Sequence, residues 1–218
     1  MIKADLHIHT NLDPEDGLKG KNIIDYNPEK LIDKAAKLGF THLSFTHHNQ
    51  IIFPREIRRY ARAKGIILIK GVEETIEGKH VVLLNPTREI NSFKELEKEK
   101  KTNEKLFVIA PHPFYPGKTC LKNELINNID LFDAIEISFF NHFFVNYFNK
   151  KAIKIAKKHD KPLITTSDSH NLKNFGYNYV VSNEKNLLDT IKNNKHKNKT
   201  EKMKTKDFLK IINSVIFN

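Results

Sequence analysis

The chain has 218 residues, of which 39% are hydrophobic and 29% charged, a composition typical of a folded water-soluble protein. No apolar run approaches the roughly 18–20 residues of a membrane span, and a single cysteine, Cys120, excludes an internal disulfide framework and a CxxC zinc site. The N-terminal residues do not form a basic-then-apolar signal segment, so we expect a cytoplasmic protein that does not bind membranes.

The chain is basic, with 37 Lys and Arg against 26 Asp and Glu and a formal net charge of +11. Such a charge favours anionic partners, including nucleic acid and phosphorylated molecules. Most of the cations are lysines, and abundant Lys, Asn and Ile are typical of AT-rich genomes, so the charge alone does not identify a partner. Arg55, Arg58, Arg59 and Arg62 are spaced to share one side of a helix and could steer an anionic ligand.

Apolar, β-branched segments alternate with amphipathic segments along the chain. Strands are predicted over 3–8, 42–46, 66–70, 81–84, 107–110, 134–138, 163–166 and 179–181. Helices are predicted over 28–38, 54–64, 92–100, 122–128, 143–159, 186–193 and 205–215. Asn27-Pro28 has the form of an N-cap followed by proline, and Gly39 and Gly65 follow predicted helix ends.

Alternating strands and helices with short connections predict parallel βαβ units, and seven or eight such units in this length favour a closed barrel. We expect one domain over 1–218, with a core over 3–191. The Lys- and Asn-rich stretch 192–206 is predicted to be mobile, and a C-terminal helix is predicted within 207–218.

The placement of the 11 histidines is the most informative feature of the sequence. His7 and His9 lie two residues apart on one predicted strand, so both point to the same face. Further metal-binding residue types lie beside other predicted strands. His80 precedes the start of one strand, and the others follow strand ends: His48, Glu73, His112, Asp168 and His170. In a β/α barrel, the carboxyl ends of the strands form the face where sites are built.

Imidazole and carboxylate groups are ligands for Zn, Mn or Fe, and this many of them would suit two or three metals that share bridging carboxylates. Four other histidines lack this placement and are expected to be structural or exposed: His42, His142, His159 and His196.

Five short motifs occur in order along the chain. They are Asp5-Leu6-His7-Ile8-His9-Thr10, Thr46-His47-His48-Asn49, Gly71-Val72-Glu73 with His80, Ala110-Pro111-His112-Pro113-Phe114, and Ser167-Asp168-Ser169-His170. Together they resemble the PHP family (polymerase and histidinol phosphatase domains), and the similarity runs from Lys3 to about Ile191. The resemblance implies an α/β fold, a distorted (β/α)7 TIM-like barrel, that hydrolyses phosphate esters with two or three divalent metals.

The resemblance also implies a ligand set. One metal would be held by His7, His9, Glu73 and Asp168, a second by Glu73, His80 and His112, and a third by His48 and His170. Asp16, in an Asp-Gly pair, matches the family's last ligand of the third metal, but about two extra residues in its loop leave Asp13 and Glu15 as competitors.

Two further positions depart from, or add to, this ligand set. His47 replaces the usual aspartate of the second motif, and it could be a ligand, a proton-transfer group or, the reading favoured here, a support behind the ligands. Glu136 also matches a family position at a strand end, and the alternative is a carboxylate paired with a surface lysine.

The predicted activity is hydrolysis of a phosphomonoester, from a small metabolite or a nucleotide, by a metal-bridging hydroxide. His47, His170 and Asp168 are the candidate catalytic residues, and Tyr115, Lys118 and Arg55 are candidates for binding phosphate. This chemistry needs no covalent nucleophile, so Cys120 is expected to be a packing residue.

Two alternatives remain from the sequence. One is a 5′–3′ exonuclease or nucleotide phosphatase that acts on nucleic-acid ends, which the positive charge favours. The other is a non-catalytic RNA-binding subunit, although such chains typically lose metal ligands and this one keeps nearly all of them. The substrate, the identity of the metal and the oligomeric state are left open.

Overall fold

A computed structural model describes residues 1–15, 24, 26–137 and 146–201. The described strands are β1 (Ile2–Ile8), β2 (His42–Phe45), β3 (Ile67–Ile76), β4 (Lys79–Leu84), β5 (Phe107–Ala110), β6 (Ala134–Ile137), β7 (Leu163–Thr165), β8 (Asn178–Ser182) and β9 (Lys197–Thr200). The described helices are α1 (Pro28–Lys37), α2 (Arg55–Ala63), α3 (Phe93–Thr102), α4 (Asn123–Asn127), a 3-10 turn η1 (Ile129–Leu131), α5 (Asn146–Lys158) and α6 (Leu187–Lys192). The helix predicted over 205–215 lies outside the described residues.

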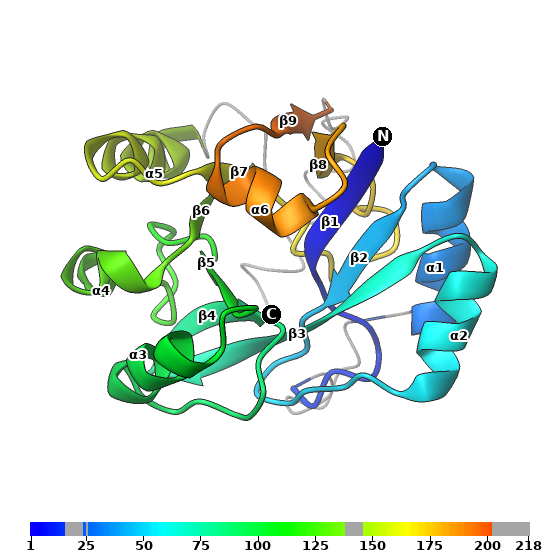
Figure 1. Ribbon diagram of the computed structural model, residues 1–218, viewed down its shortest axis with the longest axis horizontal. Coiled ribbons are helices and arrows are strands. Elements are labelled where there is room, and N and C mark those ends of the chain that lie inside the picture. The colour runs from blue at the N-terminus through cyan, green and yellow to red at the C-terminus, as the bar shows by residue number, and fades with distance from the viewer. Residues whose placement is uncertain (16–23, 25, 138–145, 202–218) are drawn as a thin grey trace.

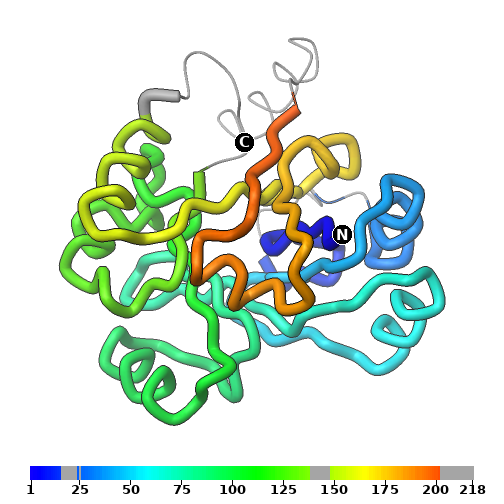
Figure 2. Tube along the Cα trace, turned by 45° about the horizontal axis from the view of Figure 1, so that its top comes forward, coloured from blue at the N-terminus to red at the C-terminus, as the bar shows by residue number. Residues whose placement is uncertain are grey.

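The nine described strands form one sheet in the order β7-β6-β5-β4-β3-β2-β1-β8-β9. The sheet curls until its two ends approach, because side chains of β9 reach β7. The Asn198 side chain accepts a hydrogen bond from the Thr165 backbone N–H (2.9 Å) and donates one to the Leu163 carbonyl (2.7 Å). The Asn198 side-chain amide thus makes the hydrogen bonds between β9 and β7 that a strand backbone would otherwise make. The result is a nearly closed barrel (Figures 1 and 2).

The predicted α/β barrel class is confirmed, and the structure shows where its regularity fails. β1 to β3 and β5 to β7 pair in parallel, as βαβ units require. β4 instead follows β3 through a tight turn at Glu77-Gly78 and pairs antiparallel to both β3 and β5. β8 is antiparallel to β1. The barrel is therefore distorted by a hairpin in place of one crossover helix.

The 192–206 stretch, predicted to be mobile, contains strand β9 in its described part. All four residues of β9 are exposed, so no apolar pattern marks the strand in the sequence. It is held by backbone pairing to β8 and by the Asn198 side chain. Hydrogen bonds rather than buried apolar surface therefore hold this strand in place, and the mobility of the stretch stays a prediction.

Local sequence signals explain several element boundaries. The Asn27 side chain accepts a hydrogen bond from the Lys30 N–H, and Pro28 occupies the first turn of α1, as predicted. Gly39 and Gly65 have left-handed φ values of 74° and 77° after α1 and α2, which confirms their role as helix-ending residues. Gly71 is required by close approach, because a Cβ there would lie 2.2 Å from Ser44 Oγ.

Helices cover the outside of the sheet. α1 and α2 lie on one side, while α3, α4 and α5 lie on the other (Figure 1). A separate apolar cluster fills the barrel, because its members come from strands far apart in the sheet order and from α6: Ala4, Leu6, Val82, Leu84, Phe107, Ile109, Ala134, Ile164, Val180, Leu187 and Ile191. This packed interior leaves the carboxyl end of the parallel strands for polar side chains.

None of the described helices combines the length and apolar character that a membrane crossing requires.

Candidate metal centre

Histidine and carboxylate side chains converge at the carboxyl end of the parallel strands. His9 follows β1, His48 follows β2, His112 follows β5 and Asp168 follows β7. The β3–β4 hairpin explains the histidine that precedes a strand: β4 runs in the opposite direction, so His80 at its start lies beside Thr75, near the end of β3. The rule that ligands lie at the carboxyl ends of strands therefore does not apply to β4. Because β4 is antiparallel, its amino end lies at the same face as the carboxyl ends of the other strands.

Glu73 lies at the centre of this group and is 1% exposed. Its Oε2 atom is close to Nε2 of three histidines: His7 at 3.2 Å, His9 at 3.3 Å and His48 at 3.2 Å. Its Oε1 atom faces two other histidines, His80 Nδ1 at 3.1 Å and His112 Nε2 at 3.3 Å. Each oxygen of one carboxylate thus has its own set of imidazoles.

Asp168 completes the Oε2 side of the centre. Its Oδ1 atom lies 3.4 Å from His7 Nε2 and 3.3 Å from His9 Nε2. Within the described residues this buried oxygen has no hydrogen-bond donor of good geometry. His7, His9, Glu73 and Asp168 have ligand atoms within 4.8 Å of one another, as do His48, Glu73 and His80.

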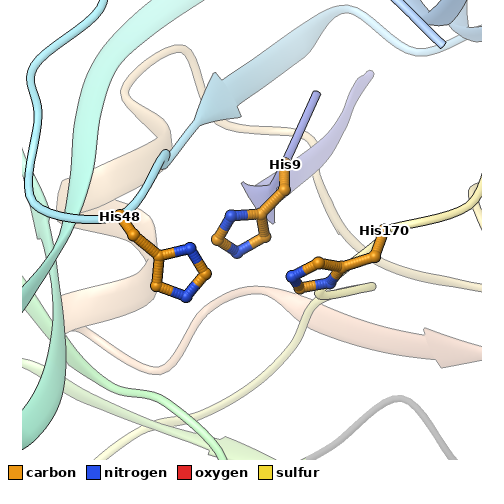
Figure 3. A group of neighbouring side chains, drawn as sticks. All are labelled: His9, His48 and His170. Carbon is orange, nitrogen blue, oxygen red and sulfur yellow. The ribbon is translucent and has the colours of Figure 1, made fainter. Parts of the chain in front are cut away.

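A third group consists of His9, His48 and His170 (Figure 3). The His9 ring lies against both of the others, with centroid distances of 4.5 Å to His48 and 4.2 Å to His170, and these two rings are 6.1 Å apart. His170 Nδ1 lies 3.0 Å from the Asp168 backbone carbonyl, which fixes the orientation of its ring. Among the candidate ligands, His170 has the most exposed side chain, at 38%.

Two buried carboxylates lie behind the rings and orient them. Glu136 Oε2 is 2.8 Å from His7 Nδ1. Asp13 Oδ2 is 2.6 Å from His9 Nδ1 and 3.0 Å from His48 Nδ1. Because an ionised carboxylate can only accept, each Nδ1 carries the proton and leaves the Nε2 lone pair free for a metal.

The charges of the centre depend on one another. Burial alone would lower the pKa of His9, but the neighbouring carboxylates of Asp13, Asp168 and Glu73 outweigh it and raise the pKa to about 10. The surrounding histidines hold the pKa of Glu73 and of Asp168 well below the usual range, although burial acts in the opposite direction. Several carboxylates thus stay ionised in a buried space and require cations.

Backbone strain coincides with the centre. His112 has a φ of 30° and Asp168 a φ of 44°, values in the left-handed region that non-glycine residues rarely adopt. The Glu136 carboxylate accepts a hydrogen bond from the His112 N–H at 3.3 Å and helps to hold that turn. Such strain persists where the surroundings fix it, and it often accompanies functional sites.

The donor set fits divalent metals. Neutral imidazole and carboxylate are the ligands that Zn, Mn and Fe accept. Here imidazole nitrogens and carboxylate oxygens lie 3.1–3.4 Å apart, so both ligand types are available at the same place. The buried Asp168 Oδ1, which lacks a hydrogen-bond donor among the described residues, is a site where a cation would replace the missing contact.

The structure brings together His7, His9, His48, Glu73, His80, His112, Asp168 and His170. Asp16, the predicted ligand of the third metal, lies outside the described residues. Its competitor Asp13 sits behind two histidines, and Glu15 accepts a hydrogen bond from the Asn49 side chain instead. Glu136, which could have paired with a surface lysine, is fully buried against His7.

His47 is not in any of the three groups formed by described residues. It is 1% exposed, and its Nε2 lies 2.7 Å from Thr10 Oγ1. Burial lowers its pKa to about 3, so the ring is neutral near pH 7. This placement matches a support behind the ligands more closely than a ligand.

The candidate phosphate-binding residues lie apart from one another. Lys118 is exposed and Tyr115 is half-buried, both on the segment between β5 and α4. The Tyr115 hydroxyl donates to Asn149 Oδ1 at 3.4 Å. Arg55 begins α2 on the opposite side of the molecule (Figure 1). The structure does not bring the three into one group.

Two contacts at the centre had no clear signal in the sequence. The Tyr26 hydroxyl lies 2.6 Å from the His9 carbonyl and 2.7 Å from the Ser169 carbonyl, and so connects the ends of β1 and β7. Cys120 Sγ lies 3.5 Å from His112 Nδ1, so this cysteine contacts the centre rather than only filling space.

Comparison with known proteins agrees with this picture. The sequence model of the PHP-associated family (PHP_C) matches residues 146–196. No curated protein sequence matches the chain. Among solved structures, PsfC from Pseudomonas syringae aligns with a TM-score of 0.62 at 15% identity, covering 99% of this chain and 97% of PsfC.

Two further structures share the fold. A protein assigned as a metal-dependent phosphoesterase from Bifidobacterium adolescentis aligns with a TM-score of 0.59 at 14% identity, covering 99% of this chain and 98% of the other. An amidohydrolase from Chromobacterium violaceum, with bound sulfate and no metal, aligns with a TM-score of 0.58 at 14% identity, covering 77% and 87%. The family model supports the resemblance to PHP proteins over residues 146–196, and the solved structures, at such identities, show the fold alone.

Proposed function

We propose that this protein is a metal-dependent phosphoesterase that hydrolyses a phosphomonoester of a small metabolite or a nucleotide. The observation that carries the proposal is the position of Glu73, whose two carboxylate oxygens each face a separate set of imidazoles. This is the arrangement expected of a carboxylate that bridges two metals. Divalent metals held there would supply positive charge for the phosphoryl oxygens and a water of lowered pKa.

The chain's own residues have distinct roles in this proposal. His7, His9, Glu73 and Asp168 hold one metal, and Glu73 with His80 and His112 holds a second. His48 and His170 contribute to a third. Asp13 and Glu136 keep the rings in the tautomer that ligates through Nε2. His47 supports the chain after β1 through Thr10.

The substrate would enter where the centre is open. His170 has the most exposed side chain of the candidate ligands, and it therefore marks the side from which a phosphate approaches. Lys118 is exposed on the segment that follows His112, and its ammonium group is a candidate for contacting a substrate anion. Asp168, between His7, His9 and His170, is the residue whose loss should affect the reaction most.

One observation favours a second candidate, an activity on nucleic-acid ends. Arg55, Arg58, Arg59 and Arg62 lie on one side of α2, and all four are exposed. Among the described residues none of them forms an ion pair, and Arg58 stacks on the Phe53 ring at 4.9 Å. The helix begins at the end of the loop that carries His48. Unpaired guanidinium groups there could bind successive phosphates of a strand.

The test is phosphate release from a chromogenic phosphomonoester with added Mn²⁺, compared between the native protein and Asp168→Asn. Asp33→Asn, an exposed aspartate on α1, is the matched control. We expect turnover that is lost in Asp168→Asn and kept in Asp33→Asn. Absence of turnover in the native protein after metal loading has been verified would contradict the small-substrate proposal.

The second candidate has its own arm of the test. A 5′-phosphorylated oligonucleotide is offered to the native protein and to the double variant Arg59→Ala, Arg62→Ala. If nucleic acid is the substrate, the double variant loses turnover on the oligonucleotide, and its rate depends less steeply on salt, while the chromogenic ester is hydrolysed as before.

A further inference from the structure

The two sides of Glu73 differ in what lies behind their histidines. A histidine that binds a metal through one ring nitrogen usually donates the other N–H to a carboxylate or a carbonyl, and this partner sets the orientation and basicity of the ring. The partners can be compared directly here, because all the rings are directed at one carboxylate.

On the Oε2 side, every ring has a buried carboxylate behind it. Glu136 accepts from His7 at 2.8 Å, and neither side chain is exposed. A single oxygen of Asp13 accepts from both His9 and His48, at 2.6 and 3.0 Å. Asp13 is fixed in turn, because its other oxygen accepts the Glu15 backbone N–H at 2.9 Å.

On the Oε1 side, no described carboxylate lies behind the rings. His112 Nδ1 faces the Cys120 sulfur at 3.5 Å, and a thiol sulfur is a weak acceptor. His80 turns its Nδ1 to Glu73, and no described residue hydrogen-bonds to its Nε2. The side chains of His80 and His112 are 14% and 12% exposed, against 0% for His7 and His9 and 10% for His48 on the opposite side.

We infer that the two metal positions are unequal: the one on the Oε1 side of Glu73, between His80 and His112, is the exchangeable position, and Cys120 is the positioning residue that sets its affinity. The inference rests on the proposed metal centre. Loss of such a partner typically costs about 10–100-fold in metal affinity, so a position with no carboxylate behind its two rings among the described residues is expected to be weaker by a factor in this range.

The experiment titrates metal-free protein with Zn²⁺ in competition with a chromogenic chelator, a readout that does not depend on activity. Cys120→Ala removes the sulfur behind His112, and Cys120→Asn offers a carbonyl acceptor in its place. Asp13→Asn is the matched control on the opposite side of Glu73. Thermal unfolding of each variant verifies that it is folded before the titration.

For the two positions beside Glu73, we expect two classes of sites in the native protein, separated by at least about 10-fold in affinity. Cys120→Ala should weaken only the weaker class and Cys120→Asn should strengthen it, whereas Asp13→Asn should weaken chiefly the tighter class. A single class, or a weaker class that neither Cys120 variant changes, would overturn the inference. Absence of any Zn²⁺ binding would instead refute the metal centre, and two classes without ester hydrolysis would refute only the proposed activity.

Discussion

Glu136 provides a quantitative test of how the centre is built, because one fully buried carboxylate has two tasks. Its Oε2 accepts from His7 Nδ1 at 2.8 Å, and its Oε1 accepts the His112 backbone N–H at 3.3 Å. Glu136→Gln keeps the shape of the side chain but replaces one acceptor by an NH₂ donor. At most one of the two contacts can then survive.

Either outcome for Glu136→Gln weakens the centre. If the amide nitrogen faces His112, two donors meet at a strained residue, and a buried unsatisfied donor costs about 1–3 kcal/mol. If it faces His7, that ring must give up its Nδ1 proton and take one on Nε2, the atom directed at Glu73 and Asp168. We expect metal affinity to fall about 10–100-fold, which corresponds to about 1.4–2.7 kcal/mol.

The assay for this prediction is the Zn²⁺ competition titration. Glu99→Gln is the control, because Glu99 is also a buried carboxylate, 4% exposed, and accepts hydrogen bonds from Thr87 on a different part of the molecule. It should lower the stability of the fold and leave metal affinity unchanged. Native-like metal affinity in Glu136→Gln would refute the reasoning that Glu136 orients His7.

Two further predictions concern the scaffold. Burial, with a smaller contribution from Glu89, raises the pKa of Glu74 to about 7 from an ordinary 4.5, so the native state loses stability as the pH rises from about 4.5 to 7. Glu74→Gln should therefore stabilise the protein at pH 8 by up to about 3 kcal/mol and have little effect at pH 4.5, as measured by denaturant unfolding; an equal effect at both pH values would contradict this assignment. Gly71→Ala would place a Cβ 2.2 Å from Ser44 Oγ and 2.9 Å from Thr46 Cγ2, so it should cost about 1–3 kcal/mol in the same assay, and an unchanged midpoint would show that β2 can move away.

Much of the fold could be predicted from the sequence because its signals are local. Asn27-Pro28 and Gly39 mark helix ends through their own backbone preferences, and alternating apolar runs mark the strands. Strand β9 could not be predicted in this way. Its residues are all exposed, and it is held by pairing to β8 and by one side chain, Asn198, whose partners on β7 are more than 30 residues away.

The ligands could be predicted more fully than the residues that orient them. His48, His112 and Asp168 follow a rule about strand ends, which depends only on the direction of each strand, whereas His7 and Glu73 lie within β1 and β3. Asp13 and Cys120 obey no such rule, because their roles depend on how loops fold back on the rings. Asp13 lies four residues after His9, as Asp16 lies seven after it, and spacing alone did not distinguish a ligand from a support.

The central claim is that Glu73 joins two metal positions, and anomalous diffraction from crystals of the protein loaded with Mn²⁺ tests it most directly. We expect one anomalous peak on each side of the Glu73 carboxylate, one near His7, His9 and Asp168 and the other near His80 and His112, in addition to any peak from the third position near His48 and His170. Peaks elsewhere on the molecule, with none beside Glu73, would contradict the metal centre described here.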